Sequence, residues 1–450
     1  MTSHNEDPII GRTSRRDFLK YAGAAGVAVG AGVGLSGAAA ACGGDKDKGG
    51  GGTPTGDAAA AATSTGAAVS NQPIGAYKPA KIGSDQMRIS FLGTSFLPRI
   101  AQQCNSVFVE VGNGDTLVFD YGSGVSSKYT ACGITPRHQD KVFITHLHGD
   151  HTSDLITLYC FGPSQDRKTP LYLFGPSGPS EDEGMHTWGK TLKKLMKWHE
   201  EAFSFLPTGL KNGQDGYEII TKELPYMETG TAYEENGVKI THFPAIHDRD
   251  GSISYKLEWN GLSMIFTGDT RPNDYVLDHG KGVDVLIHEM VVPPDVWAAK
   301  NMGLQPGDPN WDAALQTAEA VQESSHTPEL ALGYILSQTL PRLGIATHFQ
   351  VNDDTIDQAW QNVQTYYRGP FAIATDLLVC TVTKDEITLG QATVDDYAWY
   401  PPPDAYPADE LAPPKYPSPT AQLNKTLLSH EIPEEKYTPA SASPSASPSA

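Results

Sequence analysis

Cysteine is scarce in this chain, and the cysteines present form no metal-binding pattern. Only 5 occur among the 450 residues. They show no CxxC spacing, which excludes a zinc-ribbon protein. With Cys42 set aside, we expect the others to be buried free thiols, with one disulfide after export as the alternative: Cys104, Cys132, Cys160 and Cys380.

Basic residues are also few. The 33 Lys and Arg residues stand against 53 Asp and Glu, and the formal net charge is -20. Proteins that bind nucleic acid usually present a basic face to the phosphates. We therefore expect no nucleic-acid partner, and the composition agrees instead with a soluble exported enzyme.

Long, strongly apolar runs are missing too. The stretch at residues 21–41 consists mainly of Gly, Ala and Val, and it lacks the hydrophobicity of a good membrane span. It follows residues 14–20, which have the pattern of a twin-arginine export motif. Residues 1–41 are therefore predicted to be a twin-arginine signal peptide that sends the protein to the periplasm or the extracellular space.

Cys42 leaves two alternatives for the mature N-terminus. The alanines before it are compatible with a lipoprotein cleavage box, in which Cys42 is acylated and anchors the protein to a membrane. Ala39 stands where such a box usually has leucine, so simple cleavage after an Ala-x-Ala site is the alternative.

Changes in composition divide the rest of the chain into three parts. Residues 42–75 are rich in Gly, Ala and Thr and are predicted to be a disordered linker. Residues 76–398 are predicted to be one catalytic domain, with a helical insertion at about 178–235. The proline-rich residues 399–450 are predicted to be an extended or disordered tail, whose first part can lie across the domain as a strap.

Within this insertion, residues 188–199 have the spacing of a basic amphipathic helix. The apolar positions near one face are Trp188, Leu192, Leu195 and Trp198 or His199. One interpretation is a lid that places Lys193, Lys194 or Lys197 over an anionic substrate. The other is a helix that packs on the domain with its lysines in water.

The most informative motif is the HxHxDH cluster of His146, His148, Asp150 and His151, which directly follows an apolar run. His146 and His148 alternate, so they point to the same side of an extended segment. Asp150 and His151 come one turn later and would face a second ion. Imidazole nitrogens and carboxylate oxygens are ligands that zinc, manganese and iron accept. The cluster therefore predicts a site for two divalent metal ions.

Three later residues supply what such a site still needs. His247, Asp269 and His348 each follow an apolar run typical of a strand, and functional residues often lie in the loops after strands. Each alone is weak evidence, because a histidine at a strand end is more often structural. In this order after the cluster, they are predicted to be the remaining ligands.

These motifs resemble the metallo-β-lactamase-fold hydrolases, in the branch of ribonuclease Z and the arylsulfatase-like enzymes, from about residue 87 to residue 389. Further matching segments are FLGTS at 91–95, LVFDYGSG at 117–124, LYLFGPSG at 171–178, DVLIHE at 284–289 and SHTPE at 325–329. The resemblance implies an α/β fold, a four-layer αββα sandwich. Residues 239–270 are also similar to bacterial guanitoxin-biosynthesis hydrolases of this fold.

The resemblance also implies how the ligands are divided between the metals. The first metal is bound by His146, His148 and His247, the second by Asp150, His151 and His348, and Asp269 bridges the two. A hydroxide held between two metals about 3.5–4 Å apart is the nucleophile, and Asp150 accepts its proton. Zinc is the expected metal, with manganese or iron as alternatives, because His/Asp sites follow metal availability.

His326 occupies the position at which ribonuclease Z-like enzymes carry a histidine that contacts the transferred phosphoryl group. It is expected to stabilise the developing oxyanion or to protonate the leaving group. The alternative is that its loop only caps the helix that follows. Asp120, His288 and Glu289 are expected to orient the metal ligands. His242 is expected to be structural, since strand alternation points it away from His247.

These inferences predict an exported dinuclear metallohydrolase that cleaves a small anionic ester, either a phosphodiester or an aryl sulfate. The alternative enzyme is a lactonase or β-lactamase-type hydrolase that attacks a carbonyl carbon, in which His326 matters less. The alternative from another class is a non-catalytic metal-binding surface protein, which is disfavoured because every ligand position is filled. The chain also lacks a glycine- and proline-rich arm of the kind that ribonuclease Z uses to grip transfer RNA. The sequence does not specify the oligomeric state.

Overall fold

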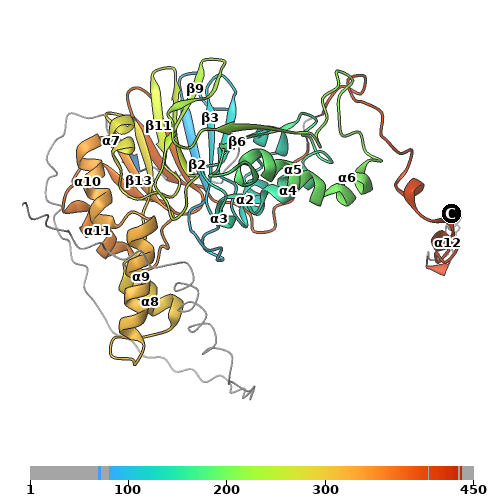
Figure 1. Cartoon of the computed structure of the whole chain (residues 1–450). Helices are drawn as coiled ribbons and strands as arrows, with labels where there is room; N and C mark the ends of the chain where they lie inside the picture. Colours follow the sequence, from blue (N-terminus) through green and yellow to red (C-terminus); the bar gives the residue numbers. More distant parts are fainter. Residues whose placement is uncertain (1–68, 72–80, 404, 434–435, 438–450) are drawn as a thin grey trace, which may run out of the picture. The chain divides into compact units, whose positions relative to one another are not determined.

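Two β-sheets packed face to face form the centre of the molecule (Figure 1). The computed structural model describes residues 69–71, 81–403, 405–433 and 436–437. The predicted signal peptide, Cys42 and most of the predicted linker lie outside these residues, as does the end of the tail.

The first sheet contains nine strands within the described residues, in the order β1-β16-β15-β2-β3-β4-β5-β6-β7. Its strands are β1 Val69–Asn71, β2 Met87–Gly93, β3 Ser106–Val111, β4 Thr116–Phe119, β5 Lys141–Phe143, β6 Leu171–Pro176, β7 Ile219–Leu224, β15 Leu378–Val382 and β16 Ile387–Gln391. β4, β5, β6 and β7 pair in parallel. β1 pairs in parallel with β16, so these residues of the predicted linker belong to the sheet.

The second sheet has seven strands in the described part of the chain, in the order β14-β13-β12-β11-β10-β9-β8. Its strands are β8 Gly230–Glu235, β9 Val238–Pro244, β10 Ile253–Trp259, β11 Leu262–Phe266, β12 Val285–Glu289, β13 Leu343–Thr347 and β14 Phe371–Ile373. β11, β12, β13 and β14 pair in parallel. The carboxyl ends of parallel strands meet at one edge of a sheet, which is where ligands commonly bind.

Helices cover the outer face of each sheet and complete the predicted four layers. Those near the first sheet are α2 Val125–Ala131, α3 Gly149–Thr152, α4 Leu155–Phe161, α5 Met185–Leu195 and α6 Lys197–Phe203. Those of the second half are α7 Asp274–Gly280, α8 Pro294–Met302, α9 Trp311–Ser325, α10 Glu329–Thr339 and α11 Ile356–Gln364. In Figure 1, α7, α10 and α11 lie beside β11 and β13, while α2 and α5 lie beside β2 and β6. The αββα sandwich is therefore confirmed.

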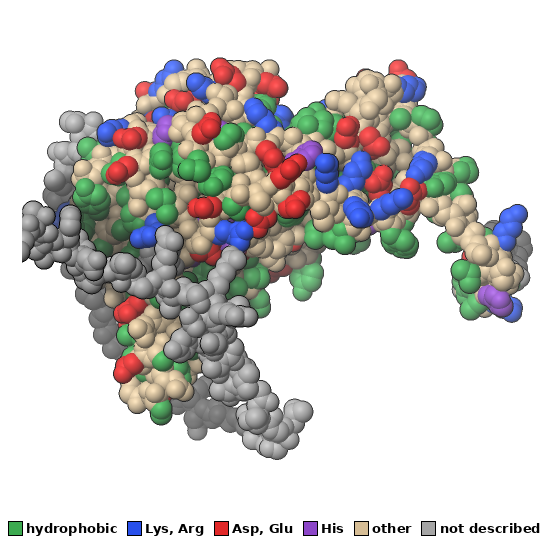
Figure 2. Space-filling model, viewed as in Figure 1, with side chains coloured by type: hydrophobic (Ala, Val, Ile, Leu, Met, Phe, Trp, Pro, Cys, Tyr) green, Lys and Arg blue, Asp and Glu red, His purple; other side chains and the backbone are tan. Residues whose placement is uncertain are grey.

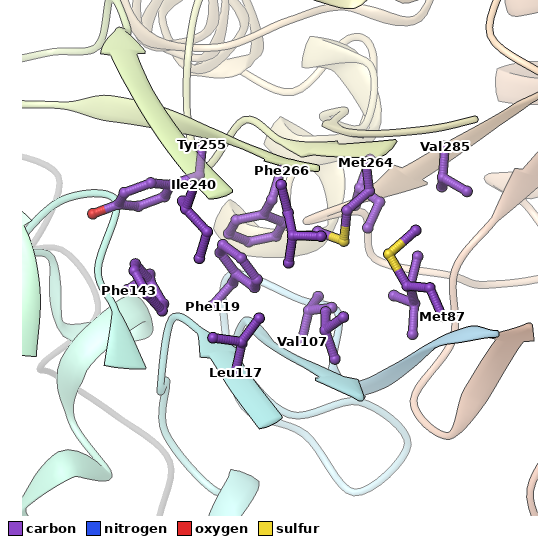
Figure 3. Packing of buried hydrophobic residues seen from close by; sticks show 14 of the residues in the cluster. Met87, Val107, Leu117, Phe119, Phe143, Ile240, Tyr255, Met264, Phe266 and Val285 are labelled. Carbon is purple, nitrogen blue, oxygen red and sulfur yellow. The ribbon is translucent and has the colours of Figure 1, made fainter. Parts of the chain in front are cut away.

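Strand alternation explains the apolar layers. In β4, Leu117 and Phe119 point into the cluster between the two sheets, whereas Val118 points out toward the helices. Figure 3 shows the inner cluster, where side chains of both sheets meet. Phe119 stacks on Phe143 with ring centroids 5.4 Å apart. A sandwich packed on both faces holds the loops at the strand ends in fixed positions.

The segment predicted to be a helical insertion at 178–235 is only partly helical. It contains α5 and α6, but its second part forms β7 and β8, the edge strands of the two sheets. The expected helix breaks at Met196, between α5 and α6. Leu192 is buried as expected, but Leu195 and Trp198 are 67% and 82% exposed, so the prediction of a single apolar face is wrong for these two.

The lysines of α5 and α6 point into water. Lys193, Lys194 and Lys197 are exposed, and Figure 2 shows basic side chains gathered over these helices. The structure therefore agrees with the second interpretation, a helix packed on the domain with solvated lysines.

The proline-rich tail runs in part along the segment of α5 and α6. Leu411 forms a β-bridge with Leu210, and the Tyr416 hydroxyl donates a 2.8 Å hydrogen bond to Glu201. A short helix, α12 Lys425–Leu428, follows. Of the described residues, no helix is both long and apolar enough to cross a membrane. The four cysteines from Cys104 onward are buried and free, as expected.

Candidate metal centre

The predicted ligands converge at the carboxyl edges of both sheets. His146 and His148 lie in the turn after β5, and Asp150 and His151 lie in α3, which starts at Gly149. The remaining ligands follow the ends of β9, β11 and β13: His247, Asp269 and His348.

Four of these side chains form a first cluster. Nε2 of His146 lies 3.1 Å from Nδ1 of His148, and Nε2 of His247 lies 3.2 Å from the same Nδ1. Oδ2 of Asp269 lies 3.8 Å from His146 Nε2 and 3.9 Å from His247 Nε2. The ligand atoms of all four lie within 4.8 Å of one another.

A second cluster adjoins the first and shares Asp269 with it. Nε2 of His151 lies 3.2 Å from Asp150 Oδ2 and 3.3 Å from Asp269 Oδ1. Nε2 of His348 lies 3.4 Å from Asp150 Oδ2 and 3.0 Å from Asp269 Oδ2. The structure thus brings together all seven predicted ligands in the grouping that the resemblance implied.

Unpaired polar atoms indicate that these side chains suit metal ions. Oδ1 of Asp269 and Nε2 of His348 are buried, and neither makes a well-aligned hydrogen bond within the described residues, although polar atoms lie 3.3 Å and 3.0 Å away. Buried polar groups normally have a partner, so such atoms require an explanation. Imidazole nitrogens that approach one another this closely cannot all carry protons, and a shared divalent cation would satisfy them. The residues present therefore fit metal ions in both clusters.

Electrostatics keeps the two carboxylates ionised. Burial alone raises the pKa of Asp269, but His348 and His151 outweigh it and hold that pKa well below its usual value. Asp150 behaves in the same way: burial raises its pKa, and the neighbouring His151 and His348 lower it by more. Ionised carboxylates are the form that binds metal.

Asp120 contacts the predicted ligand His151, in a position that suits the expected orienting role. Its Oδ2 lies 2.7 Å from His151 Nδ1, which leaves Nε2 facing the cluster. The same carboxylate accepts hydrogen bonds from the backbone N–H and the hydroxyl of Thr145, both 2.8 Å long. Asp120 and His348 have positive φ values of 56° and 61°, a conformation uncommon for residues other than glycine. At these two strand ends, the backbone turn aims a side chain at the site.

Glu289 and His326 form a pair at the edge of the second cluster. Nδ1 of His326 lies 3.0 Å from Oε2 of Glu289, whose Oε1 accepts a hydrogen bond from the backbone of Thr270. Burial lowers the pKa of His326, but Glu289 raises it by more, so the net shift is upward. The rings of His326 and His348 stack with centroids 5.2 Å apart. The imidazole of His326 therefore stands beside the predicted ligands.

His288 and His242 lie apart from the ligands. Nδ1 of His288 bonds to the carbonyl oxygen of Glu289 at 2.8 Å, and its Nε2 has no hydrogen-bond partner within the described residues. Because neighbouring strand residues face opposite ways, only Glu289 reaches the site. His242 is buried in β9, and burial lowers its pKa to about 4, in agreement with a structural role.

Asp248 is a site residue that the sequence reasoning missed. Its Oδ1 lies 3.6 Å from Nε2 of His148 and 3.5 Å from Nε2 of His247. The sequence feature that could have indicated Asp248 is its position directly after the predicted ligand His247. Its carboxylate can orient His148 or take part in holding the first metal.

The first cluster opens into a pocket of about 260 Å³. His146, His148 and His247 line it together with the loop at residues 248–252 and with Leu147, Gly178, Pro179 and Glu183. Arg249 in this loop pairs with Glu183 across the pocket. A pocket of this size suits a small molecule.

Comparisons with known proteins found two family models and several curated relatives that match parts of the chain. A family model described as anti-Pycsar protein Apyc1 matches residues 87–300, and a model of the twin-arginine translocation signal sequence matches residues 12–32. Ribonuclease Z of Bacillus licheniformis is 27% identical over 266 residues, which cover 53% of this chain and 85% of that protein. Ribonuclease Z of Natronomonas pharaonis is 29% identical over 245 residues, which cover 46% of this chain and 76% of that protein.

Among solved structures, the metallo-β-lactamase-fold protein YhfI of Bacillus subtilis aligns over its whole length with 66% of this chain. The alignment has a TM-score of 0.47 and 16% sequence identity. The fold and the relatives define a metal-dependent hydrolase of ester bonds with the metallo-β-lactamase fold. Within that class, the chain is a ribonuclease Z-like protein that carries a twin-arginine signal sequence.

Proposed function

We propose that this protein is an exported dinuclear hydrolase of small anionic esters, with phosphodiesters as the leading class and aryl sulfates as the second. The observation that carries the proposal is the position of Asp269, whose carboxylate lies 3.0–3.9 Å from histidines of both clusters. A carboxylate shared in this way would hold two divalent metal ions next to each other. The similarity to ribonuclease Z of Bacillus licheniformis supports phosphodiester chemistry.

Asp150 and His326 have different expected roles in the reaction. Two bound divalent ions would lower the pKa of a shared water toward about 7 and polarise the ester oxygen. Asp150 lies at the second cluster, 3.2 Å from His151 and 3.4 Å from His348, where its ionised carboxylate would accept a proton from such a water. His326, held by Glu289 at 3.0 Å, is placed to donate a proton to the leaving oxygen or to stabilise negative charge.

The pocket suits a small substrate. Its volume of about 260 Å³ is sufficient for a compact ester. Arg249 is the cationic side chain at its mouth, where it pairs with Glu183. The charge of this arginine is balanced by Glu183, so the metal ions and His326 would supply the attraction for a negatively charged ester.

Hydrolysis assays on the mature zinc- or manganese-loaded protein test this proposal. The panel contains an aryl phosphodiester, an aryl sulfate, a lactone and a β-lactam, each also tested with His326→Ala. His430→Ala, in the exposed tail, is the matched control. We expect turnover of the phosphodiester or sulfate, with a loss of about 10²–10⁴-fold in kcat for His326→Ala and unchanged metal content.

Two other outcomes would overturn the proposal. Turnover of only the lactone or the β-lactam, unaffected by His326→Ala, would assign the protein to the carbonyl hydrolases. Tight metal binding without turnover of any ester would assign it to the non-catalytic metal-binding proteins.

We further propose that Cys42 is lipidated after export and that the linker holds the catalytic domain near a membrane. The alanines before Cys42 and the twin-arginine signal at residues 12–32 support this proposal.

A further inference from the structure

A second pocket lies next to the metal pocket. It has a volume of about 340 Å³. Leu147, which stands between the ligands His146 and His148, lines both pockets, and so does Glu183. The two pockets are therefore neighbours, with the first metal cluster at one side of their shared wall.

The second pocket is mainly apolar. Apart from Leu147, its apolar lining consists of Ile156 from α4 and of Trp188, Leu192 and Leu195 from α5. Ile156 is 38% exposed and Leu195 is 67% exposed, so both present hydrophobic surface to solvent. Apolar surface gathered in a hollow beside polar catalytic groups is typical of a ligand-binding site.

Charge at the rim limits what can enter. Asp182 and Glu183 line the second pocket. The positive charge of Arg249 is already paired with Glu183. The lysines of α5 are absent from both linings, since Lys193 and Lys194 point into solvent. The second pocket therefore disfavours phosphate and other anionic groups and favours an uncharged apolar group.

We propose that the groove lined by Leu147, Ile156, Trp188, Leu192 and Leu195 binds an uncharged aromatic substituent of the substrate while the ester lies at the metal pocket. The substrate class is then a monoanionic diester in which the arm that stays on phosphorus is aryl. The indole of Trp188 offers a flat apolar surface, and aromatic rings pack well against one another. This inference rests on the proposed function, because it places the scissile ester at the metal centre.

Two phosphodiesters with the same leaving group test the groove. Methyl p-nitrophenyl phosphate and phenyl p-nitrophenyl phosphate both release p-nitrophenol, and they differ only in the arm that stays on phosphorus. With the metal-loaded mature protein, we expect kcat/KM to be at least about tenfold higher for the phenyl compound. Leu195→Gln should reduce this preference mainly by raising KM for the phenyl substrate.

Trp198→Gln is the matched control, because Trp198 lies in the next helix, is 82% exposed and does not line the groove. Both variants change an exposed side chain, so neither is expected to disturb folding. Equal kcat/KM for the two diesters, or a phenyl preference that survives Leu195→Gln, would overturn the groove assignment while leaving the proposed hydrolase intact.

A binding measurement separates this inference from the proposed function. Diphenyl phosphate should quench tryptophan fluorescence in the native protein and not in Trp188→Phe. Quenching without hydrolysis of either diester would retain the groove and refute the hydrolase. Hydrolysis of both diesters without any quenching that depends on Trp188 would refute the groove.

Discussion

Oδ2 of Asp120 lies 2.7 Å from Nδ1 of His151, so a buried carboxylate behind the site fixes which nitrogen of this histidine faces the cluster. Asp120→Asn keeps the shape of the side chain but removes its charge. We expect affinity for the second metal to fall by about 10–100-fold, as is typical when such an orienting group is lost. Isothermal titration of the metal-free protein with zinc measures this affinity. Unchanged affinity in a correctly folded variant would refute the orienting role.

Asp248 is predicted to support the first metal. Its Oδ1 lies 3.6 Å from His148 Nε2 and 3.5 Å from His247 Nε2. Asp248→Asn should weaken zinc binding at the first cluster by about 10–100-fold. Asp250→Asn is the matched control, because Asp250 lines the same pocket and is also exposed. Equal zinc affinities for the two variants would show that Asp248 does not support metal binding at the first cluster.

Glu329 is predicted to make stability depend on pH. Burial raises its pKa from 4.5 to about 7, and its Oε1 has no hydrogen-bond partner in the described part of the chain. The folded protein therefore holds a proton that the unfolded chain releases at lower pH. This contribution is complete below pH 4.5 and is lost as the pH rises through about 7.

Glu329→Gln isolates this effect. The free energy of unfolding of the native protein relative to the variant should fall by at most about 3 kcal/mol between pH 4.5 and pH 8. Urea unfolding of both proteins across this range gives the difference. A difference that stays constant with pH would show that Glu329 does not titrate as described.

Cys42 is predicted to anchor the exported protein. In an expressing cell, the native protein should partition with membranes, and Cys42→Ser should be released in soluble form. Substitution of Arg15 and Arg16 by Lys should retain both forms in the cytoplasm, because the twin-arginine pair lies in the matched signal segment. A native protein that is already soluble after export would favour simple cleavage after the alanines.

The candidate ligands could be predicted from sequence because they lie in one compact motif after β5 or shortly after the ends of other apolar strands. His247, Asp269 and His348 come one to three residues after β9, β11 and β13. Short connections leave such residues little freedom, so residues that follow neighbouring strands lie close together in the structure. Local patterns were therefore sufficient to indicate the candidate ligands, whereas their grouping and the four-layer fold followed from the family resemblance.

Features at the edges of the sheets could not be predicted in this way. β7 pairs on one side with β6, and several of its side chains are exposed. Natural edge strands are often polar, so its sequence lacks the apolar pattern of a central strand. Likewise, helical periodicity does not reveal the break at Met196 between α5 and α6. Asp248 was missed because its role depends on distances to two histidines, one of them far away in the sequence.

The metal content of the mature protein tests the central claim most directly. Metal-free protein titrated with zinc should bind two ions per chain, and phosphodiester hydrolysis should rise with the second. Asp269→Ala should lose metal and activity together, because Asp269 belongs to both clusters. Full activity with one ion per chain, or with Asp269→Ala, would contradict the shared two-metal site.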